Sequence, residues 1–328
     1  MRRRRAPHRM SRRKAPGYAG LVILALLLGL AFLGADIEML DSINIAAPVW
    51  IVLALGYLLI RLMIDCRRGR RGSATLTALL AIGYSLFAIL IFRPLWSGTG
   101  EVAATGDDFR LVSFNINKDN PDQREVARWI EAQSADFVIL LEARDRPGSV
   151  SRLLKARYPY QYDCRGDASC STLILSRVPA VGVTLHAHGD TENRRSISAL
   201  TARFTRGNDE LAITATHMPR PWPMGLQASR LRELAAVATE PGRNQIVVGD
   251  FNNVPWTFLM NRLAVDMDLR LLSRAVPSWP TGGLGAMVPI DNIYGRGCLG
   301  VVSLSRGPEI WSDHYPLVMT ARTGGCSA

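Results

Sequence analysis

Residues 245–252 read QIVVGDFN, a short apolar run that ends on a glycine, an aspartate, a phenylalanine and an asparagine. The run is brief and rich in β-branched residues, so we expect a buried strand over Gln245–Val248. Asp250 and Asn252 then stand where that strand leaves the core, on a connection of the kind that often carries functional side chains. The stretch therefore predicts a strand that delivers a carboxylate and an amide to a functional site.

Five more strings place a polar side chain beside an apolar run in the same way: SFNIN (Ser113–Asn117), LLEA (Leu140–Ala143), THMP (Thr216–Pro219), IDNIY (Ile290–Tyr294) and SDH (Ser312–His314). The patterning predicts nine strands, at Arg110–Asn115, Phe137–Leu141, Thr172–Ser176, Ser196–Phe204, Leu211–Thr216, Gln245–Val248, Ile290–Tyr294, Val301–Leu304 and Leu317–Ala321. It predicts helices from Pro121 to about Gln133 and over Gln227–Val237. Many strands and few helices favour two packed sheets covered by helices, an α+β sandwich.

In this order along the chain, the six strings resemble the motifs of the endonuclease/exonuclease/phosphatase superfamily of metal-dependent phosphoesterases. The resemblance covers residues 109–321. It implies a deoxyribonuclease-like, two-sheet α/β sandwich that hydrolyses phosphate esters with Mg²⁺, or with Mn²⁺ as the alternative ion. The histidine of THMP makes the chain more similar to the deoxyribonuclease, sphingomyelinase and inositol-phosphatase branches than to the abasic-site endonucleases.

The resemblance also implies a metal site and a base. Glu142 corresponds to the principal metal ligand, with Asn115 and Asp313 completing or supporting the site. Hard oxygen ligands of this kind suit Mg²⁺, which keeps waters and substrate oxygens as its other ligands. His314 corresponds to the general base that activates water, and Asp291 to the carboxylate that orients its ring.

Three further side chains are implied to act on the phosphate. Asp250 and Asn252 correspond to the pair that positions the nucleophile and stabilises the transition state. His217 has two open roles, as the acid that protonates the departing oxygen or as a donor to a phosphate oxygen. Asn117 occupies a position that varies in the family, so its role stays open.

The first third of the chain predicts a membrane anchor. Three uncharged stretches, Gly17–Ala35, Ser42–Ile60 and Ser73–Phe92, hold 19, 19 and 20 residues, close to the ~20 that cross a bilayer as a helix. The segments between them alternate in charge, with +8 over residues 1–16, −3 over residues 36–41 and +4 over residues 61–72. Because basic loops stay in the cytoplasm, we expect a multi-pass protein of the bacterial inner membrane with a cytoplasmic N-terminus and a periplasmic catalytic domain.

These patterns divide the chain into a basic tail (1–16), a three-helix anchor (17–92), a linker (93–108) and a catalytic domain (109–328). The predicted spans contain no Asp, Glu, Lys, Arg or His, which argues against a transporter. Residues 93–328 carry a net charge of only +2, so no broad cationic surface for nucleic acid is evident, although Arg194, Arg195 and Arg220 could form a local patch. The substrate class stays open between nucleic acid and a lipid head group beside the bilayer, and no protein partner can be inferred. The alternative is a catalytically silent binding scaffold of the same fold.

Cysteine usage fits this topology. Cys66 lies in the basic loop on the reducing side, whereas Cys164, Cys170, Cys298 and Cys326 fall outside. The five residues between Cys164 and Cys170 allow a bridge between them, and a Cys298–Cys326 pair stays open. His186 and His188 belong to none of the strings and are expected at the surface.

Overall fold

The computed structural model describes residues 17–324, apart from 97–101, 104–107, 145, 165–170, 187–196, 207–208, 223, 241–242, 284 and 286. The described chain forms two compact units. One contains the residues up to Phe32 together with Ala47–Ala88, and the other contains Leu33–Ala46 together with everything from Ile89. The acidic segment between the first two apolar stretches, residues 36–41, groups with the second unit.

The first unit consists of apolar helices: α1 (Ala19–Leu33), α3 (Ala47–Arg67) and α4 (Arg71–Ile91). Helices α3 and α4 are each long and apolar enough to cross a membrane, and a third span is present if α1 and α2 (Glu38–Ile45), which meet at 119°, count as one. Helix α3 runs past the predicted end of its span and includes Arg61 and Asp65, which form an ion pair at 3.0 Å. This ion pair lies in the last turns of α3.

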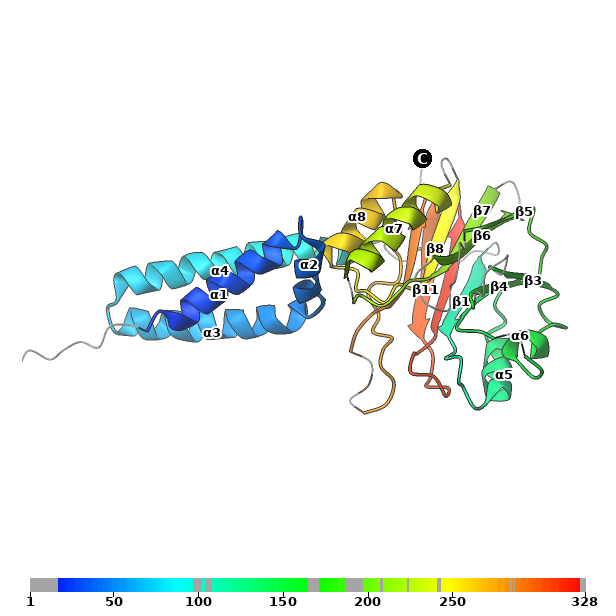
Figure 1. The fold of residues 1–328 in the computed structure, drawn as a ribbon, viewed down its shortest axis with the longest axis horizontal. Helices are drawn as coiled ribbons and strands as arrows, with labels where there is room; N and C mark the ends of the chain where they lie inside the picture. The colour runs from blue at the N-terminus through cyan, green and yellow to red at the C-terminus, as the bar shows by residue number, and fades with distance from the viewer. Residues whose placement is uncertain are drawn as a thin grey trace, which may run out of the picture. The chain divides into compact units, whose positions relative to one another are not determined.

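The second unit is built on two six-stranded sheets (Figure 1). The first has the order β11-β12-β1-β2-β4-β3 and the second the order β5-β6-β7-β8-β10-β9. The strands are β1 (Phe109–Asn115), β2 (Phe137–Leu141), β3 (Tyr160–Asp163), β4 (Leu173–Ser176), β5 (Gly182–Leu185), β6 (Ser198–Arg206), β7 (Asp209–His217), β8 (Asn244–Asp250), β9 (Arg270–Leu271), β10 (Asp291–Arg296), β11 (Leu299–Arg306) and β12 (Leu317–Thr323). All nine predicted strands are present. The predicted two-sheet sandwich is confirmed.

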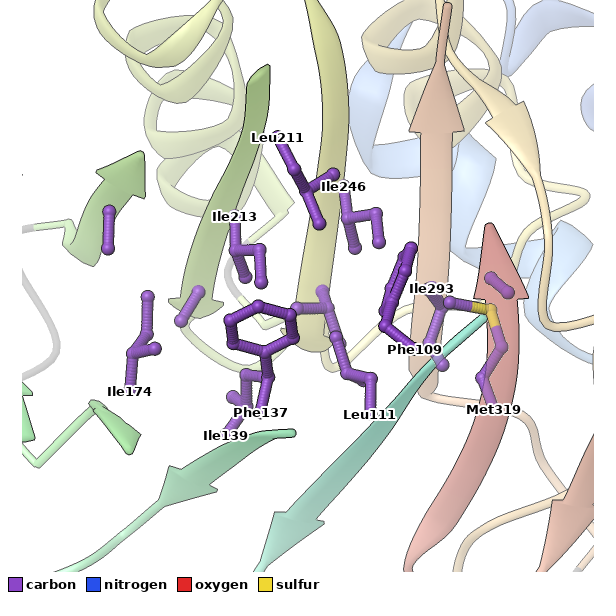
Figure 2. Packing of buried hydrophobic residues seen from close by; sticks show 14 of the residues in the cluster. Phe109, Leu111, Phe137, Ile139, Ile174, Leu211, Ile213, Ile246, Ile293 and Met319 are labelled. Atoms are coloured by element: carbon purple, nitrogen blue, oxygen red, sulfur yellow. The ribbon is translucent and has the colours of Figure 1, made fainter. Parts of the chain in front are cut away.

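The inner faces of the two sheets form one apolar core (Figure 2). Leu111 and Ile139 from the first sheet pack with Ile213, Ile246 and Ile293 from the second, and all five side chains are fully buried. At roughly 25 cal/mol per Å² of buried apolar surface, such a layer supplies the main force that holds the sheets together. The polar strand ends described below lie at one edge of this layer.

Helices cover the outer faces and complete the sandwich. Helix α5 (Gln123–Gln133) packs Val126 and Ile130 onto the first sheet, and the side chain of Asp122 caps its N-terminus. Helices α7 (Met224–Ala238) and α8 (Phe258–Asp266) cover the second sheet. The short elements are α2, α6 (Val150–Leu153) and the 3₁₀ turn η1 (Arg93–Leu95).

The cysteines and one histidine complete the comparison with the sequence. Cys164 and Cys298 are disulfide-bonded and Cys66 is a free, exposed cysteine. The predicted partner Cys170 and the open partner Cys326 both lie outside the described residues, as do Arg194, Arg195 and His188. The surface role expected for His186 is wrong, because its ring is 4% exposed and bonds the hydroxyl of Thr201 at 2.8 Å.

Candidate active site

Strand register places three of the predicted site residues side by side. In the parallel pair β7–β8, His217 lies opposite Asp250, and in the antiparallel pair β8–β10, Asp291 lies opposite the same Asp250. Because parallel strands end together and an antiparallel neighbour begins where they end, the two carboxylates and the imidazole reach one edge of the sheet. Asp250 is 1% exposed and stands at the centre of the group.

The first sheet meets this edge through Asn115 and Glu142. Asn115 ends β1, and its amide nitrogen donates to Asp250 Oδ2 at 3.1 Å and lies 3.5 Å from Glu142 Oε1. Glu142 follows β2 directly and adopts a positive φ of 55°. Left-handed backbone at a non-glycine residue costs energy and clusters at functional sites. The backbone turn at Glu142 therefore directs the chain away from β2, at the end of the sandwich where site residues from both sheets meet.

His314 and Asp291 form a buried pair. The carboxylate Oδ2 of Asp291 lies 2.7 Å from Nδ1 of His314, and the opposite ring nitrogen, Nε2, lies 3.8 Å from Asp250 Oδ2. Burial alone would lower the pKa of His314, but the charges of Asp291 and Asp250 outweigh it and raise that pKa to about 10. Both ring nitrogens of His314 therefore face carboxylates, which favour the protonated imidazole.

His217 and Asn252 enclose Asp250 from the other side. Nε2 of His217 lies 3.6 Å from Asp250 Oδ2 and 3.9 Å from Glu142 Oε1. Asn252 adopts a positive φ of 48°, donates from its backbone to Asp250 Oδ1 at 2.8 Å and donates from its side chain to Met218 O at 2.9 Å. The connection after β8 is thus tied to the connection after β7.

Asp313 lies further out than the other predicted residues. Its carboxylate is exposed and accepts hydrogen bonds from Asn117 Nδ2 at 3.0 Å and from Trp279 Nε1 at 3.3 Å. Asn117, whose role the sequence left open, therefore links the segment that follows β1 to the SDH string. Ser312 strengthens the same join, because its hydroxyl donates to Asn115 O at 2.7 Å.

Trp279 and Ser278 are site residues that the sequence reasoning did not assign. The hydroxyl of Ser278 accepts from the backbone of Asp291 at 3.1 Å and so supports the start of β10. The Ser-Trp-Pro string at 278–280 is the signal that could have marked them. All eight predicted site residues lie at this end of the sandwich, linked by the contacts above.

The site is rich in negative charge and fits a cation. Among the described residues, ligand atoms of Asp250, Asp291 and His314 lie within 4.8 Å of one another, and Glu142 stands beside them. Burial and the neighbouring charge of Asp291 raise the pKa of Asp250, because both disfavour its ionised form. Carboxylate and amide oxygens are donors that a hard divalent ion prefers. The donor set therefore suits such an ion.

This geometry agrees with comparisons to known proteins. The model of the endonuclease/exonuclease/phosphatase family matches residues 112–314, and the chain belongs to that family. Its members include phosphodiesterases and nucleases, and the family is typically dependent on divalent metals. No curated protein matches the chain.

Solved structures share the fold. A family member from Beutenbergia cavernae DSM 12333 is 22% identical with a TM-score of 0.53, over 66% of this chain and 72% of that one. TDP2 from D. rerio, solved with a single-strand DNA product, is 16% identical with a TM-score of 0.53, over 66% and 99%. A family protein from Leptotrichia buccalis C-1013-b is 13% identical with a TM-score of 0.52, over 64% and 98%. At these identities the likeness concerns the fold.

Proposed function

We propose that this protein is a membrane-anchored, Mg²⁺-dependent phosphodiesterase. One observation carries the proposal: two histidines approach the same oxygen of Asp250. Nε2 of His217 lies 3.6 Å from Asp250 Oδ2, and Nε2 of His314 lies 3.8 Å from it. Two imidazoles on either side of one buried carboxylate provide a base and an acid for opposite sides of a phosphate. The family membership supplies the reaction class, hydrolysis of a phosphoric ester.

In the proposed reaction, Nε2 of His314 takes a proton from a water molecule. The water oxygen bonds to phosphorus as the bond from phosphorus to the leaving oxygen breaks. Asp291, 2.7 Å from Nδ1, holds the ring and stabilises the imidazolium that forms. Asp250 and Asn252 orient the water and the phosphate, and His217 meets the leaving oxygen or a non-bridging oxygen.

The metal ion would be held by Glu142 and Asn115, with Asp313 supporting the site. When bound, a divalent cation neutralises charge on the phosphate and, by its own charge, lowers the pKa of His314 toward the range in which a base works. Mn²⁺ is the expected substitute because it accepts the same oxygen ligands.

The direct test is a parallel assay of the full-length protein in detergent micelles. DNA, RNA, phospholipids and phosphomonoesters are each incubated with Mg²⁺ and with excess chelator. We expect Mg²⁺-dependent cleavage of a phosphodiester that the chelator abolishes. Turnover that persists in chelator would reject the metal, and a protein that binds one of these ligands without cleaving any would be a silent scaffold.

His217 is predicted to protonate the leaving oxygen. His217→Gln keeps an N–H that can bond a phosphate oxygen but has no proton to give, whereas His217→Ala lacks both. We expect both variants to lose about 10²–10⁴-fold on an alkyl phosphodiester and little on a nitrophenyl diester, whose leaving group departs unaided. The kcat values of the two variants on the two substrates measure this. Equal losses of His217→Ala on both substrates, with His217→Gln nearly active, would assign the electrostatic role instead.

The topology proposal places the C-terminus outside the cytoplasm. It rests on the alternating charges of residues 1–16, 36–41 and 61–72. Alkaline phosphatase fused after residue 324 should be active, because the enzyme works only after export. The matched fusion after Gly69, in the basic loop, should be inactive. The reverse pattern would overturn the localisation.

A further inference from the structure

The segment between the first two apolar stretches is part of the catalytic unit. Residues 33–46, which include α2, group with the catalytic domain, and α2 lies against α7 and α8. Arg262 in α8 reaches back to donate to Ala35 O at 2.6 Å. The acidic segment therefore folds onto the helices that cover the second sheet.

Asp41 is the best-anchored residue of this segment. Its side chain is fully buried, and its two carboxylate oxygens accept from the backbone of Phe258 at 3.1 Å and of Leu259 at 2.8 Å. The first N–H groups of a helix have no partner within the helix, so a carboxylate there satisfies them and meets the positive end of the helix dipole. Asn44 donates to Asp41 at 2.9 Å and holds it in place. Asp41 thus caps α8 from a distant part of the chain.

Trp256 provides a second attachment to the same segment. Its indole nitrogen donates to Asn44 O at 2.9 Å, its side chain is 7% exposed, and its ring meets that of Phe92 edge to face with centroids 5.7 Å apart. Trp256 follows the GDFN string by four residues. The connection between β8 and α8 is therefore held at its far end by residues 41 and 44.

Buried hydrogen bonds continue from this attachment to both catalytic connections. Thr257, which caps α8 beside Asp41, donates to Asn253 Oδ1 at 3.2 Å, and Asn253 donates to Gln227 Oε1 at 2.9 Å. The amide nitrogen of Gln227 then donates to three carbonyls, at 2.8 Å to Pro219, 3.0 Å to Phe251 and 3.3 Å to Asn252. Pro219 ends the THMP string, and the other two belong to GDFN.

We propose that Asp41 is a positioning residue for the active site. By fixing the start of α8, it sets Asn253 and Gln227, and these hold the connections that carry His217, Asp250 and Asn252. The segment that joins two apolar helices is thereby a structural part of the catalytic centre. The claim about catalysis rests on the proposed function, whereas the claim about local order does not.

Glu38 offers a matched control within the same helix. Its carboxylate pairs with Arg232, whose side chain is 58% exposed, and among the described residues this pair lies outside the hydrogen bonds that link Thr257, Asn253 and Gln227. Exposed ion pairs contribute little to stability. Glu38→Gln and Asp41→Asn make the same chemical change, but only the second touches the cap of α8.

The first test measures amide hydrogen exchange in the full-length protein. Asp41→Asn should raise exchange about tenfold over residues 217–219 and 250–256, the scale of losing a helix cap, while Glu38→Gln should not. Trp256→Phe, which removes only the indole donor, should raise exchange over the same residues. Unchanged exchange over these residues in both Asp41→Asn and Trp256→Phe would overturn the proposal. A uniform rise that also includes β1 of the first sheet and the helix α5 that covers it would overturn the proposal as well.

The second test measures kcat and KM of the same proteins well below their unfolding temperatures. Asp41→Asn should lower kcat about tenfold and leave KM within about twofold, because the catalytic groups shift while the substrate contacts largely persist. Ile130→Val shortens a buried side chain of α5, which packs on the first sheet. This variant controls for a general loss of stability and should keep the wild-type kcat. If the wild type hydrolyses no phosphodiester, the proposed function fails and the exchange result alone decides the positioning role. If the wild type is active and Asp41→Asn keeps its kcat, the positioning role fails and the function stands.

Discussion

Glu142→Gln should reduce phosphodiester hydrolysis by on the order of 10³-fold at saturating Mg²⁺. The substitution keeps the shape of the side chain and an oxygen acceptor for Asn115, which lies 3.5 Å away. It removes the negative charge that follows β2, and with it the ligand proposed to hold the ion. The ion's stabilisation of charge in the transition state is therefore lost, while the fold is kept. Steady-state rates over a Mg²⁺ titration, with Mn²⁺ binding followed by calorimetry, measure the effect.

Glu210→Gln is the control for this change. Glu210 also lies on the second unit, at the far end of β7 from His217, and its exposed carboxylate pairs with Arg243 at 2.5 Å. We expect wild-type rates and wild-type Mn²⁺ affinity from it. A Glu142→Gln protein that binds Mn²⁺ as tightly as the wild type would show that the ion is held elsewhere. Asp250 and Asp291 from the second sheet and His314 from the β11–β12 connection of the first, whose ligand atoms lie close together, would then be the ligands to test.

The sheets were predictable where strands are buried. Central strands such as β2 and β8 present nearly continuous apolar runs, so periodicity located them within two residues. The strands that were missed, β3, β5 and β9, all pair on one side only or lie at a sheet edge. β3 and β5 have four residues each and no buried residue, and β9 has two residues. Whether an edge segment forms a strand depends on the neighbouring strand with which it pairs. The residues of the segment itself do not identify that neighbour.

The residues of the candidate site were predicted as members of short strings, whereas the contacts that position them were not predicted. Each of Glu142, Asp250 and His314 follows or precedes a strand in a short string, so local sequence marks it. The bonds from Asp41 to Phe258 and Leu259 join residues 217 and 218 positions apart. No local pattern identifies such a partner, because a lone aspartate in an acidic stretch reads as a solvated charge.

His314→Asn should lower kcat by about 10²–10⁴-fold, the loss expected for a general base. The amide nitrogen of asparagine can take the place of Nδ1 and keep a hydrogen bond to Asp291, which now lies 2.7 Å from that ring nitrogen. Only Nε2, the nitrogen that would take the proton, is missing. The measurement is the pH dependence of kcat/KM with Mg²⁺ bound. The acidic limb, which reports the base losing its proton, should be present in the wild type and absent in the variant.

Asp291→Asn tests the contribution of the Asp291 charge separately from that of His314, the proposed base. The carboxamide oxygen can still accept from Nδ1, so the ring stays in place, but the charge that raises the pKa of His314 is gone. The pKa of His314 should therefore fall, the acidic limb should move to lower pH, and the loss in kcat should be smaller than for His314→Asn. His186→Asn is the matched histidine control, because that ring is equally buried and bonds the hydroxyl of Thr201 outside the candidate site. It should keep the wild-type pH profile even where it costs stability. If the acidic limb survives in His314→Asn, the base is another group, and His217, whose Nε2 lies 3.6 Å from the same oxygen of Asp250, would be the next residue to test.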